Sequence, residues 1–346
     1  MRIVLTILAS LFTIMTLLPL SKKEYWWIRV FDYPRVQIVV CSIIIIALML
    51  ILKYYSWPQI VLMVVLSLAT IFQAVLIYPY TPLAKVQTLK SSNSNENITL
   101  RIFINNVRMY NKKFENVIEA IEKVDPDIIL LMETDSLWVE NLRALEKSHP
   151  YKLLEPLDNT YGIVFYSRLK LHNASVKHLV EDYIPSIHCT VELKSGDKVN
   201  VYCLHPSPPT PKTDTEERDA EIVMVGKTVK QSGQPSVVMG DLNDVAWSHT
   251  TRLFQRISGM SDPRVGRGFF NTYNAFIPVF RFPLDHVFHT SHFRLVDIKR
   301  LESVGSDHFP MYIELSYEPE HKNVQDIPKP DSEDHQEAKE KVEQVK

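Results

Sequence analysis

Three long apolar runs occupy the first eighty residues of the chain. They cover residues 3–20, about 36–52 and about 60–78, and none has a charged residue in its interior. Each approaches the ~20 residues that a helix needs to cross a hydrocarbon core of ~30 Å. Tyrosine and tryptophan residues cluster at the ends of the runs, as they do in the aromatic belts of membrane proteins. The pattern predicts three transmembrane helices within residues 1–80.

The first run also fits a cleaved signal peptide, because Arg2 precedes it. No small-x-small cleavage site follows cleanly before the second run, so we expect three retained spans in a multi-pass inner (cytoplasmic) membrane. The loop of residues 21–35 carries four basic residues, which favours the inside for this loop and for the chain after the third span. Arg2 and the α-amino group favour the inside for the N-terminus instead, which places the later part of the chain outside.

Residues 99–316 alternate between strand-like and helix-like patterns. Phe114, Val117, Ile121 and Val124 share one face of a helix. A second helix is predicted over residues 214–231, and strands over residues 99–105, 128–132, 162–166, 198–204, 236–239, 284–288 and 311–315. Such an alternation predicts a layered α/β domain with packed sheets, although it leaves the strand order open.

The segments that flank this domain are polar. Residues 81–98 and 317–346 hold too few apolar residues to bury much area, so we expect a flexible linker and a charged, disordered tail. The formal net charge of −2 gives no long-range attraction to a nucleic-acid backbone, which weakens a nuclease hypothesis without excluding it. Cys189 and Cys203 have no metal-ligand spacing, and two buried free thiols are favoured over a disulfide.

Acidic, amide and imidazole side chains stand where the predicted strands end. Because such positions converge on one edge of a sheet, we expect the set to form one site rather than several isolated caps and turns. Its members are Glu133, His205, Asp241, Asn243, Asp285, Asp307 and His308.

This set suits the hydrolysis of a phosphate ester. Glu133 and Asp307 offer the carboxylate oxygens that Mg²⁺ prefers, with Mn²⁺ as an alternative cation. Asp241 is a candidate base for the attacking water, and His205 and His308 can hydrogen-bond or protonate phosphoryl oxygens. Amides such as Asn106 and Asn243 can hold the phosphate or the water without adding charge. Zinc is less attractive, because no HxH or HExxH spacing occurs.

The order of the motifs resembles the endonuclease/exonuclease/phosphatase superfamily, which includes the DNase I-like nucleases, neutral sphingomyelinases and inositol-phosphate phosphatases. The matching segments are NNVRMYN, DPDIILLMET, YGIVFYSR, VYCLHPSPP, VVMGDLND, PLDHVF and GSDHFP. The resemblance implies a four-layer α/β/β/α sandwich of the DNase I-like type over residues 99–316, here preceded by three transmembrane helices. It also implies a hydrolase that acts on phosphate ester bonds, as a phosphatase or phosphodiesterase.

The resemblance assigns roles residue by residue. Glu133, Asp307 and Asn106 correspond to metal-site positions. The catalytic positions are His205, Asp241, Asn243, Asp285 and His308, with Asp285 as support for a histidine or the sheet edge. Arg168, together with Asn243, is a candidate contact for the substrate phosphate, although an arginine that ends a strand is as often a surface residue.

The predicted spans bear on the substrate. A short linker would hold the site near the bilayer, which favours a lipid-borne phosphate such as a polyprenyl pyrophosphate. The layout resembles membrane members of the superfamily that are associated with glycopeptide resistance and act on such carriers from the outer face, so we expect an exported domain. The alternatives are a membrane-tethered nuclease acting on DNA or RNA and an inactive binding module. The proline-rich residues 206–213 form either one wall of the site or a surface loop.

Overall fold

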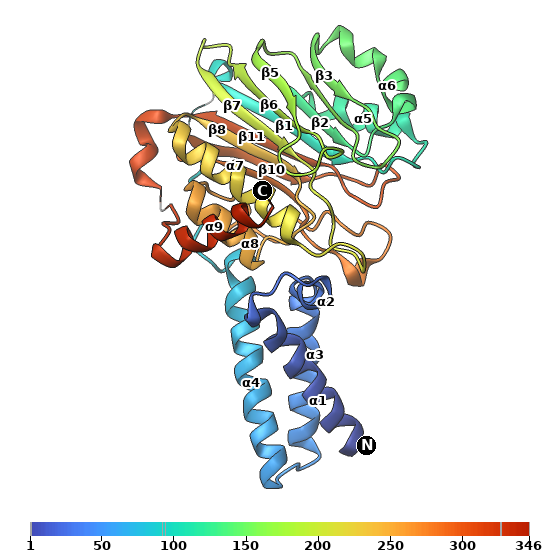
Figure 1. Cartoon of the computed structure of the whole chain (residues 1–346), viewed down its shortest axis with the longest axis vertical. Helices are drawn as coiled ribbons and strands as arrows, with labels where there is room; N and C mark the ends of the chain where they lie inside the picture. Colours follow the sequence, from blue (N-terminus) through green and yellow to red (C-terminus); the bar gives the residue numbers. More distant parts are fainter. Residues whose placement is uncertain (1, 92, 94, 326, 346) are drawn as a thin grey trace.

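The three apolar runs fold as long helices. The computed structural model describes residues 2–91, 93, 95–325 and 327–345. Helices α1 (Arg2–Leu17), α3 (Arg35–Ile51) and α4 (Trp57–Ile77) lie side by side and project from an α/β domain, with the N-terminus at the far end (Figure 1). Short 3₁₀ turns η1 (Leu18–Ser21) and η3 (Tyr78–Tyr80) extend α1 and α4 towards the domain.

Two of these helical segments, Arg2–Ser21 and Trp57–Tyr80, are long and apolar enough to cross a membrane. The sequence predicts three uniform spans, but the second run does not form one continuous helix of that length. Its helix α3 has 17 residues and follows α2 (Trp26–Arg29) and η2 (Val30–Asp32) after a bend of 73°, so it counts as a third candidate only if the bent pair is one span. The bend falls at Pro34, whose ψ of +34° is not helical and which has no backbone N–H to continue the hydrogen bonds of the preceding turn.

Buried charges hold this bend. Asp32 accepts hydrogen bonds from both Arg29 and Arg35, and the three side chains are almost fully buried. Arg35 also donates to Gln73 of α4, which fixes the bend against a second helix. The Asp32 carbonyl accepts a 2.7 Å hydrogen bond from the indole of Trp247 in the α/β domain. The helices and the domain are therefore joined through paired polar groups as well as through the chain.

Two sheets make up the α/β domain. The first has the order β10-β11-β1-β2-β4-β3 and the second the order β5-β6-β7-β8-β9. The strands of the first sheet are β1 (Thr99–Asn106), β2 (Ile128–Met132), β3 (Tyr151–Glu155), β4 (Ile163–Ser167), β10 (Phe293–Arg300) and β11 (Met311–Tyr317). Those of the second are β5 (Leu171–Lys177), β6 (Ser186–Glu192), β7 (Lys198–Leu204), β8 (Ser236–Asp241) and β9 (Asp285–His289). Each strand that the sequence predicts is present.

The sheets and helices form four layers. The inner faces of both sheets share one apolar core, to which Ile104, Leu130, Val201 and Met239 contribute. Helices α5 (Phe114–Val124) and α6 (Ser136–Asn141), with η5 (Arg143–Lys147), cover the outer face of the first sheet. Helices α7 (Glu216–Ser232) and α8 (His249–Ser258) cover the outer face of the second. The layered α/β prediction is confirmed, and the buried, unpaired Cys189 and Cys203 confirm two free thiols.

Residues 81–98 lie along the domain instead of forming a free linker. Thr88 is fully buried, and its hydroxyl is 2.8 Å from Nε2 of His289. The side chain of Gln87 accepts a hydrogen bond from the Asp262 backbone, and Lys90 forms a bridge with Leu295. The short turn η4 (Glu96–Ile98) then leads into β1. Residues 92 and 94 of the predicted linker lie outside the described residues. The sequence did not reveal these contacts, because they depend on hydrogen bonds and not on the burial of apolar side chains.

The prediction of a disordered tail is wrong for most of its length. After η7 (Pro319–Val324), helix α9 (Ser332–Gln344) packs on α7 and α8, and Figure 1 shows the three helices together. Ala338 and Val342 of α9 join an apolar cluster with Leu253, and Arg256 makes two 2.7 Å hydrogen bonds to Asp334. Few apolar anchors suffice here, since ion pairs supply much of the contact. Residues 326 and 346 lie outside the described part.

Lys341 gives a test of this packing. It is 5% exposed and pairs with Asp219, at 3.0 Å, and with Glu24 of the helical region. Lys341→Met is expected to destabilise the protein by about 2–4 kcal/mol, because the fully buried Asp219 and the half-buried Glu24 keep fewer positive partners. Lys339→Met is the control, since Lys339 is exposed and pairs with Glu343 within α9 itself. Thermal unfolding in detergent measures the stability of the two variants. Equal melting temperatures for Lys341→Met and Lys339→Met would contradict the packing of α9 on the domain.

Candidate active site

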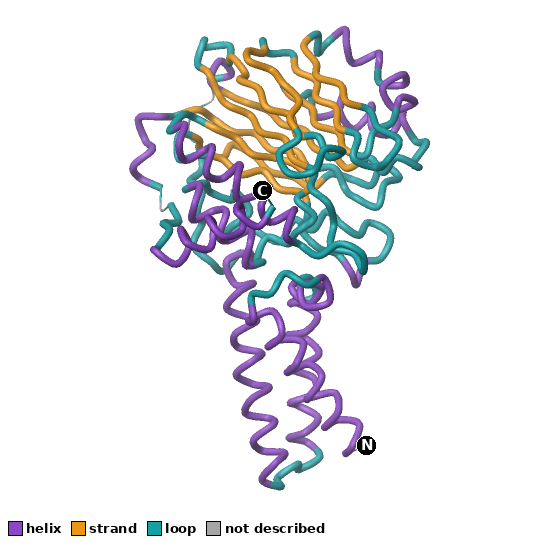
Figure 2. The backbone as a smooth tube through the Cα atoms, in the orientation of Figure 1, coloured by secondary structure: helices purple, strands orange, loops and turns teal. Residues whose placement is uncertain are grey.

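The chemically active side chains lie at one edge of the two sheets. Asn106 ends β1 and Glu133 follows β2, which runs parallel to β1. His205 follows β7 and Asp241 ends β8, which is parallel to β7. Asp285 begins the antiparallel β9 opposite Asp241. Figure 2 shows that the loops at this edge lie between the sheets and the long helices.

Gly240 allows β7 and β8 to lie close together just before Asp241. Its φ is +141°, and a Cβ atom there would lie 1.9 Å from the Leu204 carbonyl oxygen. A larger residue would therefore separate the two strands whose ends carry His205 and Asp241. This requirement accounts for the glycine in the GDLND motif.

Asp241 is the centre of the polar cluster. Its Oδ2 accepts a 3.1 Å hydrogen bond from the Asn106 amide, which also donates to Glu133 Oε1 at 2.8 Å. The same Oδ2 lies 3.5 Å from His308 Nε2 and 3.9 Å from His205 Nε2. Asp241 is 1% exposed. The structure thus brings together five of the residues that the sequence singles out.

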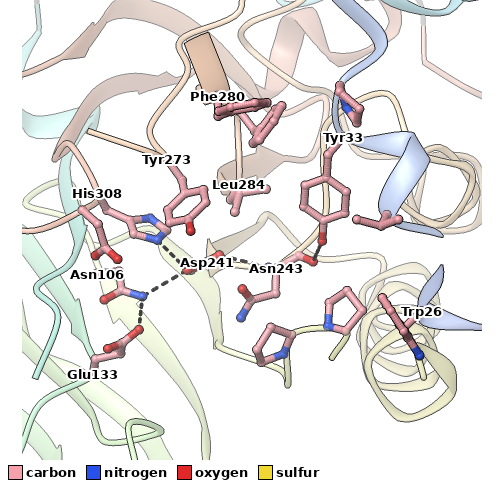
Figure 3. Close-up of a pocket in the computed structure, with 16 residues that line it drawn as sticks. Trp26, Tyr33, Asn106, Glu133, Asp241, Asn243, Tyr273, Phe280, Leu284 and His308 are labelled. Atoms are coloured by element: carbon pink, nitrogen blue, oxygen red, sulfur yellow. Dashed lines mark hydrogen bonds and ion pairs between the residues drawn. The ribbon is translucent and has the colours of Figure 1, made fainter. Parts of the chain in front are cut away.

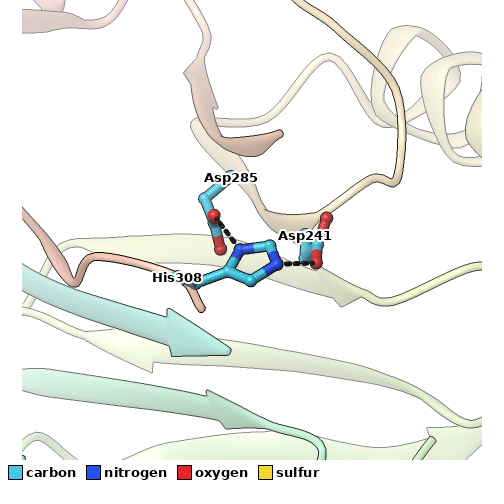
Figure 4. A group of neighbouring side chains, drawn as sticks. All are labelled: Asp241, Asp285 and His308. Carbon is cyan, nitrogen blue, oxygen red and sulfur yellow. Dashed lines mark hydrogen bonds and ion pairs between the residues drawn. The ribbon is translucent and has the colours of Figure 1, made fainter. Parts of the chain in front are cut away.

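His308 is held between two carboxylates, as Figure 4 shows. Its Nδ1 is 2.8 Å from Asp285 Oδ2, and its Nε2 faces Asp241. Burial lowers the pKa of His308, but the charges of Asp285 and Asp241 outweigh burial and raise this pKa to about 10. Both ring nitrogens of His308 therefore face carboxylates. Although Asp241, Asp285 and His308 are close enough to surround an ion, their arrangement is that of a hydrogen-bonded triad.

Two further carboxylates, those of Glu133 and Asp307, face the same pocket. Glu133 accepts a hydrogen bond from the neutral amide of Asn106, whose own oxygen accepts from the Arg108 backbone at 3.0 Å. Asp307 accepts from Ser306 at 3.3 Å, and Arg108 is 4.0 Å away. Asn106 therefore bridges two carboxylates as a donor in this arrangement, rather than offering its oxygen to a cation.

Backbone strain accompanies the site. Arg108, Glu133 and Asn243 have φ angles of +59°, +58° and +49°, in the left-handed region that side chains other than glycine adopt infrequently. Three such residues around one pocket indicate that the surrounding contacts hold the site against local preference, as they do at many functional sites.

The loop after Asp241 is clamped by residues that sequence reasoning did not identify. Asn243 donates its backbone N–H to Asp241 Oδ1 and its side-chain amide to the Pro206 carbonyl. Its own carbonyl accepts from the Tyr33 hydroxyl at 2.6 Å and from Arg218 Nη1 at 2.7 Å. Tyr33 comes from the bend between the first two long helices. No local pattern marks it, because the contact spans 210 positions of the chain.

A pocket of about 520 Å³ contains the site, within the size range of small-molecule sites. Asn106, Glu133, Asp241, Asn243, Asp307 and His308 line it, while His205 and Asp285 flank it. Tyr273 also lines it, with its ring 4.9 Å from that of His308. Pro208 and Pro209 are lining residues as well, so the proline-rich loop does form a wall.

Arg168 is not brought to the site. It follows β4, which runs antiparallel to β2, so it lies near Ile128 at the opposite end from Glu133. Its guanidinium pairs with Asp125 at 3.2 Å. The prediction that Arg168 contacts the substrate phosphate is wrong, because a strand of opposite direction carries its C-terminal residue to the other edge of the sheet.

Residues 106–308 match the model of the Endonuclease/Exonuclease/phosphatase family. The chain belongs to this family. The matched segment begins at Asn106 and ends at His308, so it includes the acidic, amide and histidine side chains that lie at this edge. No curated protein matches the chain.

Solved structures share the fold of this family domain. The human Nocturnin catalytic domain, crystallised with a bound sulfate anion, has 16% identity and a TM-score of 0.54; the match covers 68% of this chain and 97% of that one. TDP2 from D. rerio, complexed with a single-strand DNA product, has 16% identity and a TM-score of 0.52, covering 63% and 99%. A protein of unknown function from Enterococcus faecalis V583 has 17% identity and a TM-score of 0.52, covering 63% and 100%.

Proposed function

We propose that this protein is a membrane-anchored, divalent-metal-dependent phosphohydrolase that acts on a lipid-borne phosphate ester, such as a polyprenyl pyrophosphate. One observation carries the proposal. The pocket that holds Asp241 and His308 is completed by Trp26, Val30 and Tyr33. These residues belong to the connector, residues 21–35, between the first two long apolar helices. A substrate phosphate in this pocket would lie next to the point where α1 ends and α3 begins.

The surface of the helices supports membrane anchoring. Many of their large apolar side chains face outward, among them Ile7 of α1, Ile44 of α3 and Leu68 of α4, which are 60%, 53% and 62% exposed. Apolar residues on all sides of a helix suit lipid rather than water. With two continuous candidate spans and a bent third, this surface favours a multi-pass membrane protein.

The donor set fits a hard divalent cation. Glu133, Asp241 and Asp307 put three carboxylates in one pocket, and a phosphate would add further negative charge. Mg²⁺ is held by carboxylate oxygens together with water and phosphate oxygens, and Mn²⁺ has similar preferences. Glu133 and Asp307 would hold the ion, because Asp241 is engaged by two histidines and Asn106. When bound, the cation would neutralise charge on the phosphoryl oxygens.

The remaining residues have separate tasks in this proposal. Asp241 accepts a proton from the attacking water, and Asn106 and Asn243 keep its two oxygens oriented through hydrogen bonds. The Nε2–H of His308 faces the pocket side of Asp241 and can donate to a phosphoryl oxygen. Asp285 holds the opposite nitrogen of His308 and so sets the direction of that donor. His205 would supply a second donor to the phosphate.

Metal removal tests the cation site. Activity on a phosphate ester is expected to be lost in EDTA and restored by Mg²⁺ or Mn²⁺. Glu133→Gln, which removes one charged ligand, should raise the Mg²⁺ concentration for half-maximal activity by at least about 10-fold. Glu155→Gln serves as the control, because Glu155 lies on β3, two strands away from β2 in the same sheet, and does not line the pocket. Full activity in EDTA, or an unchanged Mg²⁺ requirement in Glu133→Gln, would contradict the assignment.

A substrate panel tests the lipid assignment. The full chain in detergent is given undecaprenyl pyrophosphate, phosphatidylinositol lipids, sphingomyelin and plasmid DNA in parallel, with Asp241→Asn as the blank. Release of phosphate or headgroup from a lipid is the expected result. Rapid cleavage of DNA alone would replace the proposal by a membrane-tethered nuclease. Specific binding of a lipid without turnover by the wild type would indicate an inactive binding module.

We further propose that the α/β domain lies on the outer (periplasmic or extracellular) side of the membrane. The connector of residues 21–35 and the domain occupy the same end of the helices (Figure 1), so one measurement places both. Reporter fusions after Lys346 should be active only when the reporter requires export. Activity of a cytoplasmic reporter at this position would reverse the assignment and leave the chemistry unaffected.

A further inference from the structure

The pocket has an apolar end as well as a polar one. In Figure 3, Glu133, Asn106 and His308 lie at one end, and Trp26 lies at the other. Among its apolar lining residues are Trp26, Val30 and Pro34 of the connector and Phe280, Phe282 and Leu284 of the segment that leads into β9. We call these six residues the apolar slot. The hydrolysis of a phosphate alone requires no such surface.

Both walls of the slot are fixed by hydrogen bonds. On the connector side, the backbone N–H of Trp26 donates to the Asp214 carboxylate at 2.8 Å, and the backbone N–H of Thr215 donates to the Glu24 carbonyl at 3.0 Å. On the opposite side, the turn η6 (Pro278–Phe280) is held by Gln37 of α3, whose amide donates to the Val279 carbonyl at 2.6 Å. The slot is therefore a formed feature that lies between the apolar helices and the domain.

The outer rim of the slot is strongly apolar and exposed. Val30 is 44% exposed on one wall and Phe280 is 53% exposed on the other. The neighbours of Phe280 in the same turn are exposed too, with Phe276 at 52%, Ile277 at 48% and Val279 at 67%. Such a contiguous apolar surface marks an interaction site in a folded protein. It lies where α3 meets the domain, which is the level of a bilayer surface if the helices span one.

We propose that the apolar slot binds the hydrocarbon chain of a lipid phosphate while its phosphate occupies the polar end. This inference rests on the proposed function for the reaction and adds a separate binding site for the chain. Hydrocarbon fits the slot because its lining side chains carry few polar atoms, and the Tyr33 hydroxyl beside it is engaged by the Asn243 carbonyl. The chain enters between the connector and η6, a path that leads directly from the helix surface to Asp241.

Chain-length selectivity tests the slot. Farnesyl and dimethylallyl pyrophosphate carry the same headgroup on chains of different length, so the ratio of their kcat/KM values reports binding of the chain. In Trp26→Ala and in Phe280→Ala this ratio should fall at least about 10-fold, because each variant removes a large apolar contact. Trp27→Ala is the matched control: Trp27 lies in the same helix but stacks on Tyr25 and does not line the pocket.

The partial exposure of Phe280 makes its replacement a mild change for folding, so a loss of selectivity there is interpretable even if Trp26→Ala folds poorly. An unchanged ratio in Phe280→Ala, or an equal fall in Trp27→Ala, would overturn the slot.

Photolabelling separates failure of the slot from failure of the proposed reaction. Full-length Asp241→Asn in nanodiscs is irradiated with a farnesyl phosphonate that bears a diazirine at the end of the chain, and peptides are mapped by mass spectrometry. Labels are expected within residues 26–34 and 276–284, and excess undecaprenyl phosphate should displace them. Labelling there without hydrolysis by the wild type would keep the slot and refute the reaction. Hydrolysis with labels elsewhere, or with labelling that a soluble protein or peptide displaces better than lipid, would refute the slot.

Discussion

Asp241→Asn is expected to lower kcat by about 10³-fold, which is the range for loss of a general base. The substitution keeps the size of the side chain and its hydrogen bond from the Asn243 backbone. It removes the negative charge that lies 3.5 Å from His308 and 3.9 Å from His205. The water loses its proton acceptor and the histidines lose their common anion. Initial rates on the preferred lipid substrate, at saturating Mg²⁺, measure the effect.

Asp197→Asn provides the control for this result. Asp197 lies between β6 and β7, at the opposite end of β7 from the site, and accepts a hydrogen bond from Ser195. Its replacement should leave kcat within about twofold, since it affects only a surface turn. An Asp241→Asn enzyme with more than about a tenth of wild-type kcat would assign the base to another residue and would remove the main element of the mechanism.

The pair of His308 and Asp285 should behave as one unit. His308→Gln and Asp285→Asn are each expected to lower kcat by about 10²- to 10⁴-fold. The double variant should lose little more than the worse single variant, because Asp285 acts through the nitrogen of His308 that it holds at 2.8 Å. Residues in direct contact are where such non-additivity arises. A double-mutant cycle of kcat values is the measurement.

His172→Gln is a suitable control for this cycle. His172 also pairs with a carboxylate, that of Glu192, at 2.6 Å, but on the edge strand β5 away from the pocket. Multiplicative effects of His308→Gln and Asp285→Asn would show that the two residues act independently. Asp285 would then support the sheet edge rather than position the histidine, which is the other role that the motif order implies.

The walls of the pocket explain why we favour a lipid over a nucleic acid. A nucleic-acid site needs cationic side chains along a groove, because phosphate contacts dominate its affinity. Here Trp26, Val30 and Phe280 line the same pocket as Asp241, and the first two belong to the connector between the apolar helices. The related structure of D. rerio TDP2 with a DNA product shares the fold, whereas Trp26 and Val30 of this wall come from the connector that precedes the family domain.

Much of the domain follows from the sequence because its central strands are apolar on both faces. β2 and β7 begin and end where the pattern predicts, and the amphipathic pattern of α5 is confirmed. β3, β5 and β10 were not predicted, because they are edge strands and partly exposed, so the apolar signal is weak. β6 is buried, but its polar residues such as Ser186 and His188 obscure it.

The sequence by itself determined the apolar helices, the layered α/β domain and the members of the acidic and histidine cluster. Each of these is recorded in a local pattern: a run of apolar residues, a period of 3.6 or 2, or a polar residue directly after a buried strand. The same reasoning misplaced Arg168, since only the antiparallel direction of β4 decides at which edge that residue lies.

Only the tertiary structure decided what surrounds that cluster. The hydrogen bond from Tyr33 to Asn243 and the wall formed by Trp26 join segments that are about two hundred positions apart. The docking of α9 depends likewise on ion pairs across the fold. Such contacts leave no periodic trace in the chain, because they depend on where helices and strands come to lie. The sequence therefore identified the chemical groups of the site, and the tertiary structure showed that they lie beside the apolar helices.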